Sequence, residues 1–97
     1  MLLSTSLIAE QTFHGEIEKI EIVNYASGAA YITIDGAAFS ECEVKTNWCA
    51  IDFSLPAANH MFSAALATKM AGKNTRITSD GCWNTKYPRC WKVRVIE

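Results

Sequence analysis

The chain has 97 residues with a formal net charge of −1, and 49% of its residues are hydrophobic. This length corresponds to one domain, because single domains run from about 50 to 250 residues. The near-neutral charge provides no basic field for a phosphate backbone, so nucleic acid is not an expected partner. After residue 9 no apolar run approaches the about 20 residues that cross a bilayer, so no membrane span is expected.

The first nine residues, MLLSTSLIA, resemble the end of a secretory signal peptide. A short apolar stretch and small polar residues lead to Ala9, which precedes the charged Glu10. We therefore expect residues 1–9 to be the remnant of a signal peptide and residues 10–97 to form a single secreted or periplasmic domain. The alternative is that residues 1–9 form an apolar first strand.

Two strands are expected near the start of the domain. Residues 16–23 are rich in β-branched side chains, which favour a β-strand. The alternation changes phase between Ile17 and Ile20, which indicates a bulge at residues 18–19. A second strand over residues 30–34 alternates regularly and is expected to pair with the first as a hairpin.

The middle of the chain predicts a loop, a third strand and one helix. Residues 37–47 show no sustained period, whereas residues 48–53 alternate and point Cys49, Ile51 and Phe53 inward. Pro56 and Gly72 bound an alanine-rich helix over residues 57–71. Its main apolar stripe is expected at Phe62, Leu66 and either Lys69 or Met70, beside a flank of smaller residues: Met61, Ala64, Ala65 and Thr68.

The last quarter of the chain predicts two further strands. Residues 74–79 form the fourth strand, residues 80–89 are expected to be a loop, and residues 91–95 alternate as the fifth strand. In the fifth strand Trp91, Val93 and Val95 share one face. The fold class is therefore mainly β, with three strands, one helix and two strands in that order.

This element order is that of the oligonucleotide and oligosaccharide binding fold (OB-fold), a five-stranded Greek-key barrel. The segment WCAIDFSLPAANHMFSAALATKMAGKNTRIT resembles the binding (B) subunit of the subtilase cytotoxin and related small secreted bacterial proteins. The similarity runs over residues 15–78 and is firmest from Cys49 to Gly72. The resemblance implies a pentamer-forming barrel whose ring binds cell-surface glycans and carries a docked catalytic toxin subunit. No binding residue of the family is transferred to this chain.

Four cysteines, Cys42, Cys49, Cys82 and Cys90, predict two disulfides in a small exported domain. A zinc site is the alternative, but structural zinc ligands commonly stand two to four residues apart, and these pairs enclose six and seven residues. The spacing leaves three connectivities open, including the local pairs Cys42–Cys49 and Cys82–Cys90. Because the third and fifth strands of the barrel are parallel neighbours, the resemblance favours a crossed pairing, Cys42–Cys82 and Cys49–Cys90.

Several aromatic side chains border the loops that lead into the third and fifth strands: Trp48, Trp83, Tyr87 and Trp91. Aromatic faces stack on sugar rings or on apolar partner surfaces, and the nearby amide of Asn84 supplies directional hydrogen bonds. The predicted ligand-binding residues are Trp48, Trp83, Asn84 and Tyr87. The structural alternative is that Trp91 belongs to the core and that Trp83 packs over a disulfide.

Enzymatic chemistry has little support in the sequence. His14 or His60 would need a free cysteine as nucleophile, and cysteines held in disulfides are not nucleophiles. Alternation places Glu16 and Glu18 on one face of the first strand and Glu21 on the opposite face unless the bulge intervenes, and these carboxylates are expected to be solvated. No glycine-rich phosphate loop, nucleophile elbow or metal-ligand run occurs, so no catalytic residue, metal or cofactor is expected.

The sequence therefore predicts a secreted, non-enzymatic binding module that resembles a bacterial toxin B subunit. Its expected form is a homopentamer that recognises a cell-surface glycan or a host protein. The alternative is a secreted or periplasmic accessory or inhibitor domain of the same fold that binds a protein and has no lectin activity. A purely structural envelope protein is a third possibility.

Overall fold

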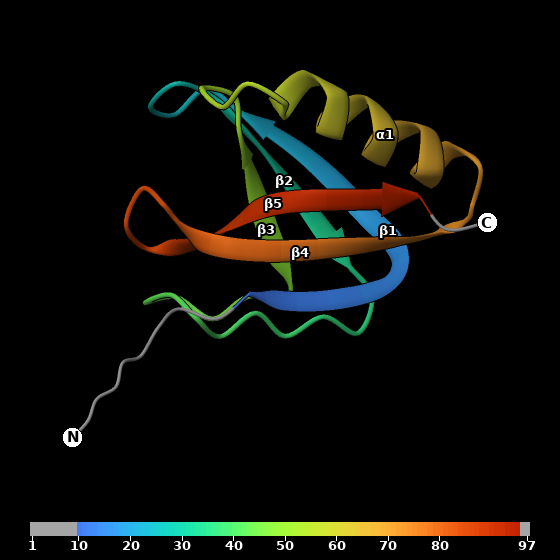
Figure 1. Cartoon of the computed structure of the whole chain (residues 1–97), viewed down its shortest axis with the longest axis horizontal. Helices are drawn as coiled ribbons and strands as arrows, with labels where there is room; N and C mark the ends of the chain where they lie inside the picture. The colour runs from blue at the N-terminus through green and yellow to red at the C-terminus, as the bar shows by residue number, and fades with distance from the viewer. Residues whose placement is uncertain (1–9, 96–97) are drawn as a thin grey trace.

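The computed structural model describes residues 10–95 (Figure 1). The predicted signal remnant, residues 1–9, lies outside the described residues. The described part is mainly β, with one helix and a five-stranded sheet, which confirms the predicted class and element order. The elements are β1 Gln11–Val23, β2 Ala29–Ile34, β3 Trp48–Asp52, α1 Ala58–Met70, β4 Asn74–Trp83 and β5 Tyr87–Val95.

The five strands pair in the order β1-β2-β3-β5-β4, and β4 returns to β1, so the sheet closes on itself. Neighbouring strands are antiparallel except for β3 and β5, which are parallel. The long strand β1 takes part in both halves of the sheet, because its first half pairs with β4 and its second half with β2. The register shifts between Ile17 and Lys19, which confirms the predicted bulge, and Figure 1 shows β1 curving from one half to the other.

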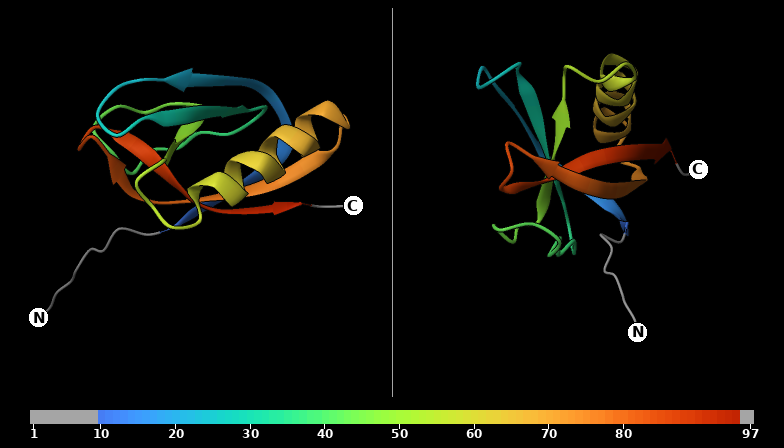
Figure 2. Two further views of the ribbon diagram at one scale, coloured as in Figure 1. Left: turned by 90° about the horizontal axis from the view of Figure 1, so that it is seen from above. Right: turned by 60° about the vertical axis from the view of Figure 1, so that its left-hand side comes forward.

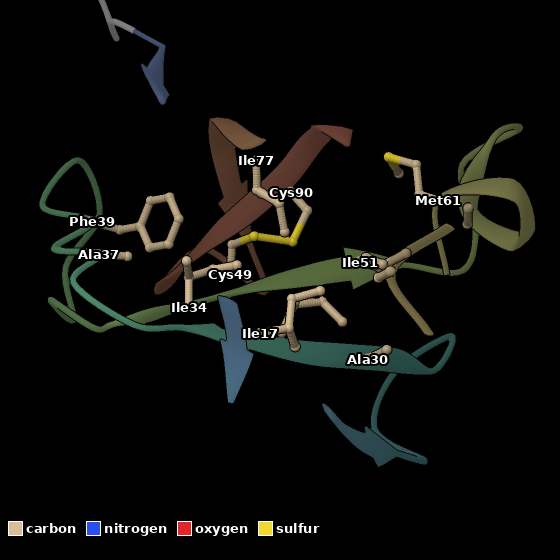
Figure 3. Close-up of a cluster of buried hydrophobic side chains, with 13 residues drawn as sticks. Ile17, Ala30, Ile34, Ala37, Phe39, Cys49, Ile51, Met61, Ile77 and Cys90 are labelled. Atoms are coloured by element: carbon tan, nitrogen blue, oxygen red, sulfur yellow. A yellow bond between two sulfur atoms is a disulfide. The ribbon is translucent and has the colours of Figure 1, made fainter. Parts of the chain in front are cut away.

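One apolar core fills the closed sheet (Figure 3). Figure 3 shows the Cys49–Cys90 disulfide between Met61 of α1 on one side and Phe39 on the other. Phe39 belongs to the predicted loop 37–47, yet it is only 1% exposed and packs edge-on against Phe13 with ring centroids 5.0 Å apart. The loop therefore contributes a core side chain that closes the end of the sheet opposite α1.

The helix packs mainly through the predicted flank of smaller residues. Its buried residues are its first residue and three of the four flank residues: Ala58, Met61, Ala65 and Thr68. Of the predicted stripe, Phe62 packs against the core, whereas Leu66 is 39% exposed and Met70 79% exposed. The small side chains of Ala58 and Ala65 let the helix backbone approach the strands closely. Gly72, with φ of +67°, ends the helix as predicted.

The predicted loop over residues 80–89 is wrong, because β4 and β5 continue through it as a long hairpin. Asn84 and Thr85 form the turn with φ of 54° and 60°, and the amide of Lys86 donates a 3.2 Å hydrogen bond to the carbonyl of Trp83. Two consecutive positive φ angles are the mark of a type I′ turn, whose twist matches that of the flanking strands. The turn therefore joins β4 and β5 without splaying the two strands.

The alternation predicted for the fifth strand breaks at Trp91. Thr78 of β4 pairs with Lys92. Its neighbour Ser79 pairs with Cys90, which leaves Trp91 without a partner in β4. An extra residue of this kind forms a bulge and re-aims its side chain. Trp91 is accordingly 41% exposed, and its predicted alternative role as a core residue is wrong.

Candidate functional site

Five aromatic rings gather on the outer face of β2 and β3, and we call them the aromatic cluster: Tyr25, Tyr31, Trp48, Trp83 and Tyr87. Tyr31 and Trp48 are stacked, with ring centroids 4.1 Å apart and an angle of 25° between the rings. Tyr87 lies 5.2 Å from Trp48, and Trp83 lies edge-on to Tyr31 at 5.7 Å. Together with the contact between Tyr25 and Trp83, these pairs join all five rings in one packed cluster.

The register of β2 and β3 explains the stack. Thr33 is opposite Trp48 and Tyr31 is opposite Ala50, so Tyr31 and Trp48 are diagonal neighbours on the same face. Ala29 and Ala50 are fully buried there and have side chains too small to fill the surface. They leave room for the long β4–β5 hairpin to fold over the outer face of the sheet.

The β1–β2 turn completes the cluster. In Figures 1 and 2 this turn and the tip of the β4–β5 hairpin lie at the same end of the molecule. Tyr25 belongs to the turn, is 58% exposed, and lies edge-on to Trp83 with centroids 6.0 Å apart. Residues from three separate parts of the chain therefore meet at one end.

The structure brings together three of the predicted ligand-binding residues. Trp48 and Tyr87 are half-buried. Trp83 is only 4% exposed, so it supports the other rings rather than presenting a face of its own. Asn84 is exposed in the hairpin turn directly after Trp83. Trp91 is not part of the cluster, and the Arg89 guanidinium lies over its ring, 4.7 Å from the centroid.

Sequence reasoning missed Tyr31 and Tyr25. The alternation of residues 30–34 already placed Tyr31 on the outward face of its strand, and Trp48 on the outward face of the third strand. The missing information was the register between the two strands, which makes them neighbours. For Tyr25 no signal was available, because only the folded hairpin brings the turn to Trp83.

Two hollows flank Trp48. One, of about 450 Å³, lies against the loop that follows β2, and includes Lys45 and Thr46 in its lining. The other, of about 570 Å³, lies beside Tyr31 on the outer face of β1 and β2. Asn47 and Trp48 line both hollows and form the wall that they share. Both volumes fall within the range of about 300 to 1,000 Å³ that is usual for ligand sites.

The bulge in β1 places charged groups around the second hollow. Regular alternation would send Glu18 and Glu21 to opposite faces of the strand, whereas the bulge brings both, together with Lys19, to the lining of this hollow. The pKa of the Tyr31 phenol is raised by burial, and further by the neighbouring Tyr87 and Glu21. Its hydroxyl therefore stays protonated at neutral pH and remains a hydrogen-bond donor.

The two disulfides follow the crossed pairing. Cys49 and Cys90 join the parallel strands β3 and β5 inside the core, with Cα atoms 5.1 Å apart. Cys42 and Cys82 join the loop after β2 to the β4–β5 hairpin, with Cα atoms 5.9 Å apart. Beside this second bridge the amide of Val44 donates a 2.9 Å hydrogen bond to the carbonyl of Lys86. The outer disulfide thus ties the wall of the first hollow to the hairpin that carries Trp83 and Tyr87.

All four cysteines are held in these disulfides, so none is available as a zinc ligand or as a thiol nucleophile. Within residues 10–95, no three His, Cys, Asp or Glu side chains are grouped as a metal site would require. Over the same residues no helix has the length and apolar character needed to cross a membrane.

Comparisons with known proteins identify no relative. No protein-family model, curated protein or solved structure matches the chain. The aromatic cluster and the two hollows beside it are therefore the features from which we infer a function.

Proposed function

We propose that the protein is a secreted, non-enzymatic binding module that recognises a glycan through the aromatic cluster. The observation that carries the proposal is the Tyr31–Trp48 stack, which stands between two hollows of ligand size. One face of a pyranose ring presents mainly C–H groups, whereas its hydroxyls project from the edge. An aromatic wall with polar groups at its rim complements both features.

The rim of the second hollow supplies those polar groups. The carboxylates of Glu18 and Glu21 accept hydrogen bonds from sugar hydroxyls, and the protonated Tyr31 hydroxyl both donates and accepts. The Asn47 side chain, which carries a donor and an acceptor, lines both hollows. Because the two hollows meet at Asn47 and Trp48, the surface fits a ligand of more than one sugar ring.

The fold supports the same surface as the binding site. We propose an OB-fold barrel, because the closed strand pairing and the helix between β3 and β4 are features of that fold. OB-folds bind oligonucleotides or oligosaccharides on the face of strands two and three and on the loops 1–2 and 4–5. Tyr31 and Trp48 lie on that face, and Tyr25 and Trp83 lie at those loops. The carboxylates of Glu18 and Glu21 at the rim would repel a phosphate backbone and favour a saccharide.

Secretion and assembly complete the proposal. Two disulfides in a small domain favour an extracellular or periplasmic location. We also propose a homopentameric ring like that of toxin B subunits, with a catalytic subunit docked on it. The apolar side of α1 supports this ring, because Leu66 and Met70 are exposed there and available to a second copy. Mass measured in solution tests the ring, and a strict monomer at micromolar concentration would exclude it.

The decisive experiment compares two tryptophans. The wild-type protein is screened on a glycan array, and the affinity for the best glycan is measured for Trp48→Ala and Trp91→Ala. Trp91 is the matched control because it is an accessible tryptophan outside the aromatic cluster. Loss of a stacking face is expected to weaken binding about tenfold or more in Trp48→Ala only. Equal effects in the two variants, with both folded by circular dichroism, would refute the aromatic cluster as the site.

One observation favours a protein partner instead. Ile22 is 63% exposed and Tyr25 58% exposed, so the β1–β2 hairpin carries apolar surface beyond the two hollows. A surface of this kind suits an accessory or inhibitor domain that binds a protein. A blank glycan array, together with loss of partner capture in Ile22→Ser but not in Trp48→Ala, would select this second function.

A further inference from the structure

A third hollow, of about 290 Å³, lies on the outer face of β1, β4 and β5 and shares no residue with the aromatic cluster. We call it the basic hollow, because three of its six lining residues are cationic: Glu10, Thr12, Arg76, Thr78, Lys92 and Arg94. The proposed glycan site makes no use of this surface. It lies in a protein whose overall net charge is −1, so its local charge is not a consequence of a basic composition.

Two arginines are directly opposite each other at one end of this surface. Arg76 of β4 and Arg94 of β5 are directly opposite in the antiparallel register. Like charges directly opposite each other destabilise a strand pair. Over residues 10–95, neither arginine forms an ion pair with a carboxylate. The pair is therefore an unfavourable arrangement for the folded chain alone.

The rest of the lining adds donors. Thr12 and Thr78 are opposite each other on β1 and β4, and their hydroxyl oxygens are 2.8 Å apart. Lys92 is opposite Thr78 on β5. Its ammonium is 3.7 Å from a carboxylate oxygen of Glu10, and both side chains are well exposed, so the attraction between them is weak. Three cations and one carboxylate leave the hollow with a net positive charge.

We propose that the basic hollow binds a tetrahedral oxyanion, namely a sulfate or phosphate group. The guanidinium groups of Arg76 and Arg94 present paired N–H donors, the geometry that matches two oxygens of such a group. One of the Thr12 and Thr78 hydroxyls donates to the other across their 2.8 Å hydrogen bond, so Lys92 and the one hydroxyl proton left free provide donors for the remaining oxygens. A bound dianion replaces the repulsion between the arginines with attraction to a common partner. The natural source is either the free ion or a sulfate ester on a polysaccharide.

Titration with inorganic sulfate tests the site itself. Backbone amide chemical shifts are followed by NMR at low ionic strength, and a matched titration with sodium chloride corrects for salt. Saturable shifts are expected at residues 76–78 and 92–94 with sulfate only. Absence of saturation, or the same shifts with chloride, would overturn the proposal.

A heparin-derived hexasaccharide and its desulfated counterpart then distinguish the two sources. Tighter binding of the sulfated hexasaccharide than of inorganic sulfate, at the same amides, identifies a sulfate ester as the ligand. Binding of the free ion without any gain from the hexasaccharide identifies the free ion. The desulfated sugar is expected to leave these amides unchanged, and equal shifts from both sugars would contradict an oxyanion site.

Charge variants give the sign of each contribution. Arg76→Gln is expected to weaken sulfate binding about tenfold, because it removes a charge-assisted donor pair. Glu10→Gln is expected to strengthen it, because it removes the one carboxylate of the hollow. Lys69→Gln, an equal charge change on the exposed side of α1, is the control and should have no effect. Equal weakening by Lys69→Gln and Arg76→Gln would show attraction to the whole protein and would refute the site.

Two further variants serve as controls. One replaces Arg76→Gln if that variant does not fold, and the other separates sulfate binding from the proposed glycan site. If Arg76→Gln does not fold, Lys92→Gln replaces it, because the Lys92 side chain is 62% exposed. Trp48→Ala is expected to keep full sulfate binding, since no residue is shared between the two surfaces. Oxyanion binding in the basic hollow is therefore tested independently of glycan recognition by the aromatic cluster.

Discussion

The two disulfides lie in different surroundings. Removing each one separately tests how much it contributes to the free energy of unfolding and whether it is needed for ligand binding. Cys49 and Cys90 are fully buried in the core that the closed sheet surrounds. Cys42 and Cys82 are nearer the surface and join the loop after β2 to the β4–β5 hairpin. The experiment compares the double variant Cys42→Ala/Cys82→Ala with Cys49→Ala/Cys90→Ala.

The cost of each change follows from loop closure and burial. The bridges span 40 and 41 residues, so the restriction that each places on the unfolded chain contributes a nearly equal amount, about 4 kcal/mol. Removing the inner pair also deletes two sulfur atoms from a close-packed core, which adds about 1 kcal/mol for each atom. The inner variant is therefore expected to lose about 6 kcal/mol and the outer variant about 4 kcal/mol.

Urea unfolding followed by tryptophan fluorescence measures this difference. A gap of about 2 kcal/mol corresponds to midpoints about 1 to 2 M apart for a domain of this size. Domains of this kind are stable by about 5 to 15 kcal/mol, so the outer variant should remain folded while the inner variant approaches its limit. Equal midpoints, or a less stable outer variant, would refute the assignment of the Cys49–Cys90 bridge to the core. Loss of ligand binding in the folded outer variant would show that the loop must be tied to the hairpin for recognition.

Two further substitutions test the turn and the loop. Thr85 is β-branched and adopts φ of 60°, a conformation that costs an L-residue about 1 to 2 kcal/mol. Thr85→Gly removes this cost but loses more conformational entropy on folding. The substitution is therefore expected to raise the free energy of unfolding by about 0.5 to 1 kcal/mol. Asn84→Gly should gain less, because asparagine tolerates this region, and a destabilised Thr85→Gly protein would contradict the turn. Phe39→Ala is expected to lower the free energy of unfolding by about 3 kcal/mol, because the ring fills the core. Glu43→Ala, an exposed position in the same loop, is the control, and similar effects of the two would place Phe39 outside the core.

Local patterns predicted most of the fold. The phase change between Ile17 and Ile20 located the bulge in β1, because side-chain alternation depends only on the strand itself. Gly72 likewise marked the end of α1, since its positive φ is a local requirement. The β4–β5 hairpin was missed because Pro88 and Gly81 are typical of loops. Pro88 of β5 nevertheless pairs with Cys82 of β4, and Gly81 with φ of +76° lies where the register of the hairpin shifts.

The sequence also did not determine which face of α1 is buried. Leu66 is larger and more apolar than Ala65, so composition favoured its side of α1 as the buried one. In the fold, Ala65 is fully buried and Leu66 is partly exposed. How closely a helix approaches a sheet depends on the space that the strands leave, and a small residue fits where a large one does not.

The aromatic character of the proposed binding surface was determined by the sequence, through Trp48, Trp83 and Tyr87. Its composition was decided by the tertiary structure, which added Tyr31 through the register of β2 and β3 and removed Trp91 through a single bulge. The same division holds for the cysteines: their number predicted two bridges, and the parallel contact of β3 with β5 determined the pairing of the inner one. The physical reason is common to all three cases. Strand periodicity is a property of neighbouring residues, whereas register and strand adjacency arise only when distant segments bury their surfaces together, and a shift of one residue turns a side chain to the opposite face.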